Sequence, residues 1–343
     1  MSYTIDVYYK KIPVEKDFIR FATFISFFPQ LVAGPIVRAK DFLPQFQTVK
    51  RFNWDRFNKG SGQMLWGFFK KVAVADSLAP FVDQCFAAPE AFSSMHLLIG
   101  VIFYAFQIYC DFSGYSDIAI GLARIMGFDF PDNFRTPYFS KNFSEFWQRW
   151  HISLSSWLRD YLYIPLGGNR HGVFNTYRNN MLTMLLGGLW HGASWVFVFW
   201  GFLHGLYLIA QRFVGPPFGR FMSAIRLPQF GKDVINMILV FFFTCLAWVF
   251  FRSPDFATAM NVITGIGGLE QFNFGSVINK FWVVKGFLLV GLLLAIEIAD
   301  FKLDFAEQIL HKPAFRVVSF ASILWLIAFF GSFGANSFIY FQF

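Results

Sequence analysis

Two histidines lie in segments that could support chemistry on a hydroxyl group. His191 is flanked by Gly188 and Gly192 within an apolar stretch, 181–210, where only His191 and His204 could carry charge. A charged group at membrane depth costs a few kcal/mol, so an ionisable residue there is a functional candidate. A neutral imidazole can accept a proton near pH 7, as a general base must. The alternative is a packed histidine among small residues that let helices approach.

His151 is the second candidate. If residues 146–155 form one helix, their spacing places Trp147, His151 and Ser155 on the same face. The imidazole would then lie beside an aromatic wall and a hydroxyl, a setting that fixes ring orientation and tautomer. The alternative is an interfacial histidine that hydrogen-bonds to its neighbours.

The spacing of the histidines does not favour a metal site. His191 and His204 lie about 220° apart around a continuous helix, so they could share a site only if the helix breaks between them. No cysteine or carboxylate lies at ligand spacing beside either histidine. We therefore expect no bound metal or cofactor, although a haem held by His151 and His191 is an alternative. The sequence also lacks a Gly-Lys-Ser/Thr phosphate loop and a Gly-x-Ser-x-Gly elbow.

Two other polar segments could contribute to a site. Asp111 and Asp117 interrupt an apolar run, together with Tyr115, and such carboxylates must face protein or a watery cavity. A short polar loop between two helices is the alternative there. The glycine-rich segment that ends in Asn169 and Arg170 could approach an anionic group closely, or it could simply be a turn.

The composition indicates a membrane protein. The chain has 343 residues, of which 56% are hydrophobic and 15% charged, and its mean hydropathy is +0.47. Soluble domains carry about 25% charged residues. The shortfall, together with 51 phenylalanines, predicts a polytopic protein with a large lipid-facing surface.

Five regions are apolar enough to predict membrane spans of about 20 residues. The region 181–210 is too long for one straight span, so it must tilt, bend at a glycine or divide in two. We predict the spans at 96–128, 181–210, 234–251, 281–298 and 315–333.

Three further apolar stretches are broken or amphipathic. Residues 18–37 contain Pro29 and Pro35 and predict a bent or re-entrant segment. Residues 62–79, with Lys70 and Lys71, and residues 140–166 are amphipathic and aromatic, which is typical of helices at the headgroup level.

The net charge of +8 is best explained by membrane orientation. Excess lysine and arginine collects in cytoplasmic loops, and residues 131–178 carry six basic side chains against three acidic ones. This region is therefore expected on the cytoplasmic side. The basic residues form no single stripe, so we expect no nucleic-acid partner.

Several of these segments resemble the membrane-bound O-acyltransferase (MBOAT) family, and within it the alginate O-acetyltransferase branch. The longest matching blocks run from Glu145 to Tyr161 and from Leu189 to Ala193. The further matching segments are Ala33-Gly34-Pro35, Asp111 to Asp117, Gly167 to Arg170, and Tyr340 to Phe343.

The resemblance implies an all-α, polytopic helical bundle with re-entrant and interfacial helices, forming a single membrane domain over residues 1–343. It implies that His191 is catalytic and that His151 is the second histidine of the site. It also implies a tunnel that ends near His191. The candidate substrate-binding residues are Trp147, Arg149, Ser155, Asp111, Tyr115, Asn169 and Arg170.

The implied reaction moves an acetyl or other acyl group from a cytoplasmic thioester such as acetyl-CoA. The acceptor would be a hydroxyl of an exported polysaccharide such as alginate, or an extracytoplasmic acetyltransferase partner, at the bacterial inner membrane. The alternative is a channel that supplies acyl groups to a separate transferase.

Proteins of the family have further helices before the point that matches Ser2 to Tyr8, so we expect that the chain lacks N-terminal helices. An inert truncated chain is therefore a third hypothesis.

Overall fold

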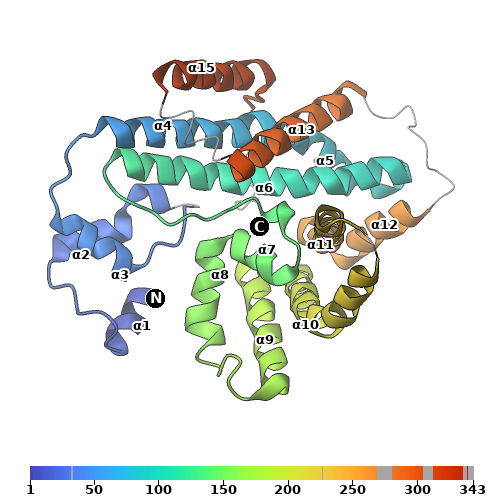
Figure 1. The fold of residues 1–343 in the computed structure, drawn as a ribbon, viewed down its shortest axis with the longest axis horizontal. Helices are drawn as coiled ribbons and strands as arrows, with labels where there is room; N and C mark the ends of the chain where they lie inside the picture. Colours follow the sequence, from blue (N-terminus) through green and yellow to red (C-terminus); the bar gives the residue numbers. More distant parts are fainter. Residues whose placement is uncertain (32–33, 226, 269–279, 304–311, 335–337, 339–343) are drawn as a thin grey trace. The chain divides into compact units, whose positions relative to one another are not determined.

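The computed structural model is helical throughout the part of the chain that it describes (Figure 1). The described residues are 1–31, 34–225, 227–268, 280–303, 312–334 and 338. They form two compact units. Of the described residues, unit 1 takes those within Met1–Ser77, Tyr109–Asn133 and Leu289–Gln342, and unit 2 takes those within Leu78–Ile108 and Phe134–Leu288. Ala33 of the Ala33-Gly34-Pro35 block, and the whole Tyr340 to Phe343 block, lie outside the described residues.

Five of the described helices are long and apolar enough to cross a membrane. This confirms an all-α, multi-pass architecture, and four of the five spans lie near the positions expected from hydropathy, the exception being the one expected at 181–210. The five are α6 (Ser94–Ile125), α10 (Trp195–Ala224), α11 (Gln229–Arg252), α13 (Lys280–Leu303, of which Lys280–Phe301 is the span) and α15 (Pro313–Phe330).

The long apolar stretch 181–210 divides in two, one of the outcomes expected. Helix α9 (Gly172–His191) ends immediately before Gly192, whose extended backbone cannot continue a helix, and α10 begins at Trp195. The break therefore falls directly after His191.

Asp111 and Asp117 do not lie in a loop, because α6 is continuous through both. The loop alternative is therefore wrong. The helix tolerates the two carboxylates because each is ion-paired with a lysine of unit 1.

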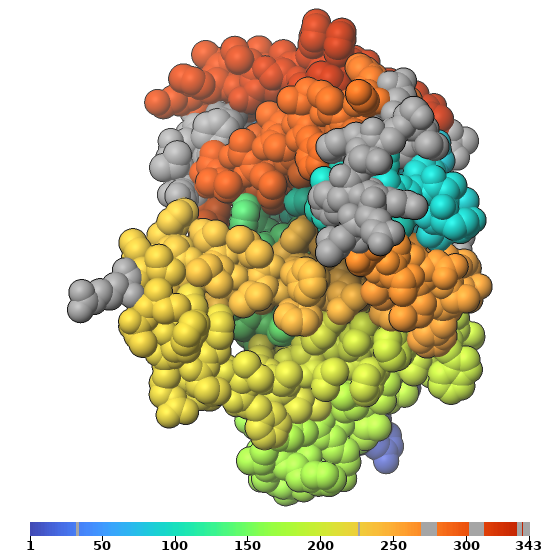
Figure 2. Space-filling view, turned by 90° about the vertical axis from the view of Figure 1, so that its right-hand side faces the viewer, coloured from blue at the N-terminus to red at the C-terminus, as the bar shows by residue number. Residues whose placement is uncertain are grey.

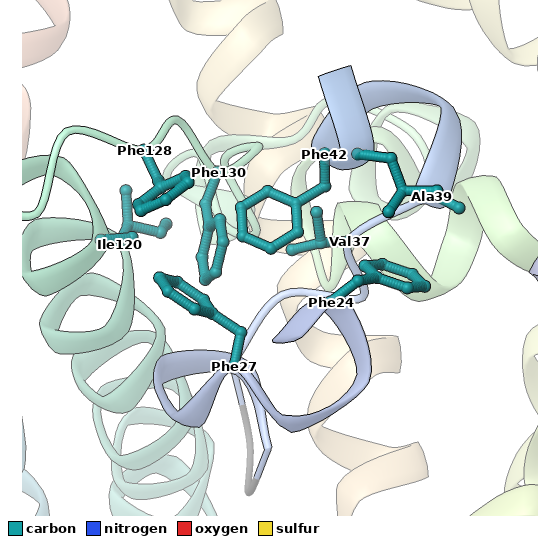
Figure 3. Close-up of a cluster of buried hydrophobic side chains, with 10 residues drawn as sticks. Phe24, Phe27, Val37, Ala39, Phe42, Ile120, Phe128 and Phe130 are labelled. Carbon is teal, nitrogen blue, oxygen red and sulfur yellow. The ribbon is translucent and has the colours of Figure 1, made fainter. Parts of the chain in front are cut away.

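Unit 1 begins with short helices that pack on phenylalanines. These include α1 (Ser2–Tyr8), α2 (Phe18–Ser26) and α3 (Ala39–Phe42). Residues 18–37 thus form no continuous span, as their prolines predicted. Figure 3 shows Phe27 and Phe42 meeting Phe128 and Phe130 in a buried cluster, with ring centroids 4.9–5.8 Å apart.

Helix α4 (Trp54–Phe68) runs alongside the unit 1 part of α6 (Figure 1). It continues into a π-helical segment (Phe69–Ala75) and then α5 (Asp76–Ala87). Lys70 is buried and Lys71 partly exposed, and both pair with carboxylates of α6.

Unit 2 contains the histidine-bearing segments. The predicted helix over 140–166 is broken into α7 (Phe143–Arg149), α8 (Ile152–Leu158) and a π-helical turn (Arg159–Tyr163). Helices α9, α10 and α11 follow, and then α12 (Phe256–Gly267). The outer surface of α11 and α12, yellow to orange, faces the viewer in Figure 2.

Candidate active site

Close packing of α9 on α10 positions His191. A Cβ atom on Gly188 would lie 2.2 Å from the Phe197 carbonyl oxygen, and one on Gly201 would lie 2.2 Å from that of Met184. Only glycine permits this backbone approach. The two helices are therefore held together at the level of the break that follows His191.

The His191 ring lies in an aromatic cage. It meets Trp190, Trp200 and Phe251 edge to face, with ring centroids 5.1 Å apart in each case. The residue is half-buried, whereas Trp190 beside it is 54% exposed. This arrangement orients the imidazole and leaves one side of the cage at the surface of unit 2.

His151 lies at the break between α7 and α8 rather than inside a helix. Trp150 is extended, and His151 has left-handed backbone angles (φ 42°, ψ 55°). The break lets the Trp150 ring stack on Phe146 and contact Trp248, and this tertiary packing overrides the helical pattern. The prediction that Trp147, His151 and Ser155 share one helical face is therefore wrong. Ser155 donates a hydrogen bond to the Trp150 carbonyl across the break.

Trp190 connects the two histidines. Its ring centroid lies 6.3 Å from that of His151 and 5.1 Å from that of His191. Phe134 stacks on the His151 ring at 6.3 Å. Two segments that are distant in sequence thus place their imidazoles against one indole ring.

Burial keeps both imidazoles neutral. It lowers the pKa of His151 well below its ordinary value, and the nearby His191 lowers it further. Burial also lowers the pKa of His191, to about 3. Neither residue lies in the candidate spans. A neutral imidazole can accept a proton, and a lowered pKa at the same time makes it a weaker base.

His204 joins the same cluster. Its spacing from His191 had suggested at most a shared metal site. It is fully buried, and its ring centroid lies 4.8 Å from that of Trp200, which also contacts His191. Trp147 contacts both Trp200 and His204. In the described part of the chain, neither ring nitrogen of His204 has a hydrogen-bond partner. His191 and His204 could come close only if the helix broke between them, and the break at Gly192 meets this condition.

The remaining unit 2 candidates are an ion-paired arginine and two exposed turn residues. Arg149 forms an ion pair with Glu145 at 2.8 Å and donates to the Arg135 carbonyl and the Thr136 hydroxyl. Asn169 and Arg170 are exposed on a turn, where Gly167 and Gly168 have positive φ angles. This matches the turn alternative.

Asp111 and Tyr115 belong to unit 1. Asp111 is ion-paired with Lys71 at 2.5 Å, and Tyr115 is half-buried against Phe338. No cluster of three or more histidine, cysteine, aspartate or glutamate side chains suited to a metal occurs within the described ranges.

The fold and the site define a multi-pass membrane protein with a caged pair of neutral histidines. The family model of the MBOAT, membrane-bound O-acyltransferase family matches residues 9–253. The chain belongs to this family.

Several curated proteins are similar to the chain. It is 44% identical over 277 residues to "Probable alginate O-acetylase AlgI" of Azotobacter vinelandii, a match that covers 80% of this chain and 52% of that protein. It is 41% identical over 256 residues to "Peptidoglycan O-acetyltransferase" of Helicobacter pylori, covering 74% and 47% respectively. "Teichoic acid D-alanyltransferase" of Bacillus subtilis is 27% identical over 250 residues, covering 69% and 62%. The chain spans about half the length of the first two relatives.

Proposed function

We propose that the chain carries the transfer centre of a membrane O-acyltransferase, with His191 as general base and His151 as its partner. The observation that carries this proposal is the shared contact of both histidines with Trp190. Catalytic bases must be held in a fixed orientation, and rings packed on three sides meet that requirement.

In the proposed reaction, the acceptor hydroxyl attacks the acyl carbon of a thioester while its proton moves to His191. The new C–O bond forms and a tetrahedral oxyanion develops, which His151 or a nearby donor stabilises. The C–S bond then breaks, and the leaving thiolate takes the proton from the His191 imidazolium. His191 is thereby returned to its neutral form.

The substrate class is a finer part of this proposal. We infer that the donor is a cytoplasmic acyl thioester such as acetyl-CoA, used as a substrate. The acceptor is a hydroxyl of an exported polysaccharide such as alginate, reached directly or through an extracytoplasmic acetyltransferase at the inner membrane. The names of the relatives support acetyl transfer, but they differ in the polymer.

A His191→Ala variant tests the proposal. Membranes that contain the protein would be offered labelled acetyl donor, and label in the polymer fraction would be measured beside membrane abundance. We expect label to fall by about 100-fold or more, since general bases contribute about 10²–10⁴-fold. His171→Ala, at an exposed histidine of the same unit, is the matched control and should retain label. Undiminished acetylation by the His191→Ala variant at normal abundance would favour the acyl channel instead.

A further inference from the structure

Glu297 is a buried carboxyl group that the acyl-transfer centre does not use. It lies on α13 within a candidate span and is 7% exposed. The Tyr109 hydroxyl donates a hydrogen bond to its Oε1 at 2.5 Å. Among the residues whose positions are described, Glu297 forms no ion pair. This buried carboxyl group therefore has a neutral hydroxyl as its direct hydrogen-bond partner.

The nearest cation is already paired. Lys70 is 3% exposed, and its ammonium group forms an ion pair with Asp117. Gln63 also donates to Asp117, at 3.1 Å. The Lys70 ammonium lies 5.7 Å from the ring centroid of Tyr109, whose hydroxyl contacts Glu297, and its charge also acts on the Glu297 carboxyl. One ammonium group thus faces two carboxyl groups.

The fold holds Lys70 in this position. A Cβ atom on Gly67 would lie 2.5 Å from the Gly114 carbonyl oxygen, so α4 and α6 are in backbone contact one turn before the lysine. The π-helical segment that follows widens the helix. Lys70 and the adjacent Lys71 consequently both reach carboxylates of α6, Asp117 and Asp111 respectively.

An ionised carboxylate without an ion-pair partner of its own is costly in a buried place. Transfer of an isolated carboxylate into an apolar medium costs so much that the group takes up a proton instead. A protonated carboxyl group needs no countercharge, and its carbonyl oxygen can accept the observed hydrogen bond from Tyr109.

We propose that Glu297 and Tyr109 form a proton-binding site in unit 1, with the Glu297 carboxyl protonated at neutral pH. The proton resides on Oε2 while Oε1 accepts from Tyr109. When the proton leaves to water, the Glu297 carboxylate competes with Asp117 for Lys70. The site therefore links the packing of α13 on α6 to protonation. The other titratable groups facing it are Cys110 on α6 and Asp300 on α13.

Infrared difference spectroscopy of the full chain in lipid vesicles tests this site without requiring acyl transfer. A protonated carboxyl group gives a C=O stretch at higher wavenumber than a carboxylate does. We expect the wild type to show such a band at neutral pH, to shift it in D₂O and to lose it at alkaline pH. Glu297→Gln should remove the band, whereas Asp300→Asn, on the same helix, should retain it. Tyr109→Phe should shift the band because it removes the hydrogen bond.

Thermal unfolding provides a second readout. A native state that holds one more proton than the unfolded state loses stability as pH rises. Glu297→Gln, which mimics the neutral acid, should fold and should lose this part of the pH dependence. Absence of the band from the wild type at neutral pH, or its persistence in Glu297→Gln, would overturn the proposal.

Discussion

The two units bury polar side chains in opposite ways. In unit 1, lysines from the α4 to α5 region are paired with carboxylates of α6, so that charges are kept but compensated. In unit 2, His151, His191 and His204 are surrounded by aromatic rings. Paired charges are fixed in place by their partners, whereas a neutral imidazole can still take up a proton. The comparison shows two ways to bury polar groups: the ion pairs of unit 1 hold charges in fixed positions, whereas the rings around the unit 2 histidines hold neutral imidazoles.

The largest effect is expected from breaking an ion pair of unit 1. Lys71→Met leaves Asp111 and Asp76 without their shared cation, and removing one partner of a buried pair costs about 3–5 kcal/mol. Thermal unfolding of the solubilised protein measures the loss. Lys59→Met is the matched control, because its pair with Asp55 is exposed and worth only about 0.2–1 kcal/mol. Equal losses of stability in the two variants would contradict the distinction between buried and surface ion pairs.

A smaller effect, dependent on pH, is expected at His151. Its pKa is lowered in the folded protein by burial and by His191, so the unfolded chain binds a proton below pH 6.5 that the native chain does not. Stability should therefore decrease as pH falls below 6.5, by about 1.4 kcal/mol per pH unit for this group. Unfolding measured over a pH series should show a shallower slope in His151→Asn. Asparagine tolerates the left-handed backbone at this position. An unchanged slope would show that His151 is not the titrating group.

The smallest effect is expected at His204. His204→Phe keeps an aromatic ring in the cluster and removes two buried nitrogens that lack partners in the described structure. An unsatisfied buried polar atom costs about 1–3 kcal/mol, and the larger ring offsets part of the gain. We therefore expect unfolding at equal or slightly higher temperature. His204→Ala should instead unfold at lower temperature, because it leaves a cavity. A marked loss of stability in His204→Phe would mean that the nitrogens stabilise the fold.

Hydropathy predicted much of the fold because lipid imposes it. A spanning helix must satisfy its own backbone and present apolar side chains, so α11 and α13 could be located from composition alone. The length of the apolar stretch around His191 also predicted that it could not be a single straight helix. The helix predicted from spacing was wrong between Phe146 and Ser155, where the packing of the Trp150 side chain outweighs helical periodicity.

For the candidate site, too, the sequence determined some features and only the structure determined others. The sequence by itself determined that His191 and His151 are unusual, because a histidine in an apolar or aromatic segment is visible as residue type and position. Only the tertiary structure decided that Trp190 joins them, that His204 completes the cluster, and that Lys70 and Lys71 meet the carboxylates of α6. The reason is physical: these contacts depend on where a helix breaks or widens and on how closely glycines let two backbones approach. Both are settled by packing between segments that are far apart in the chain.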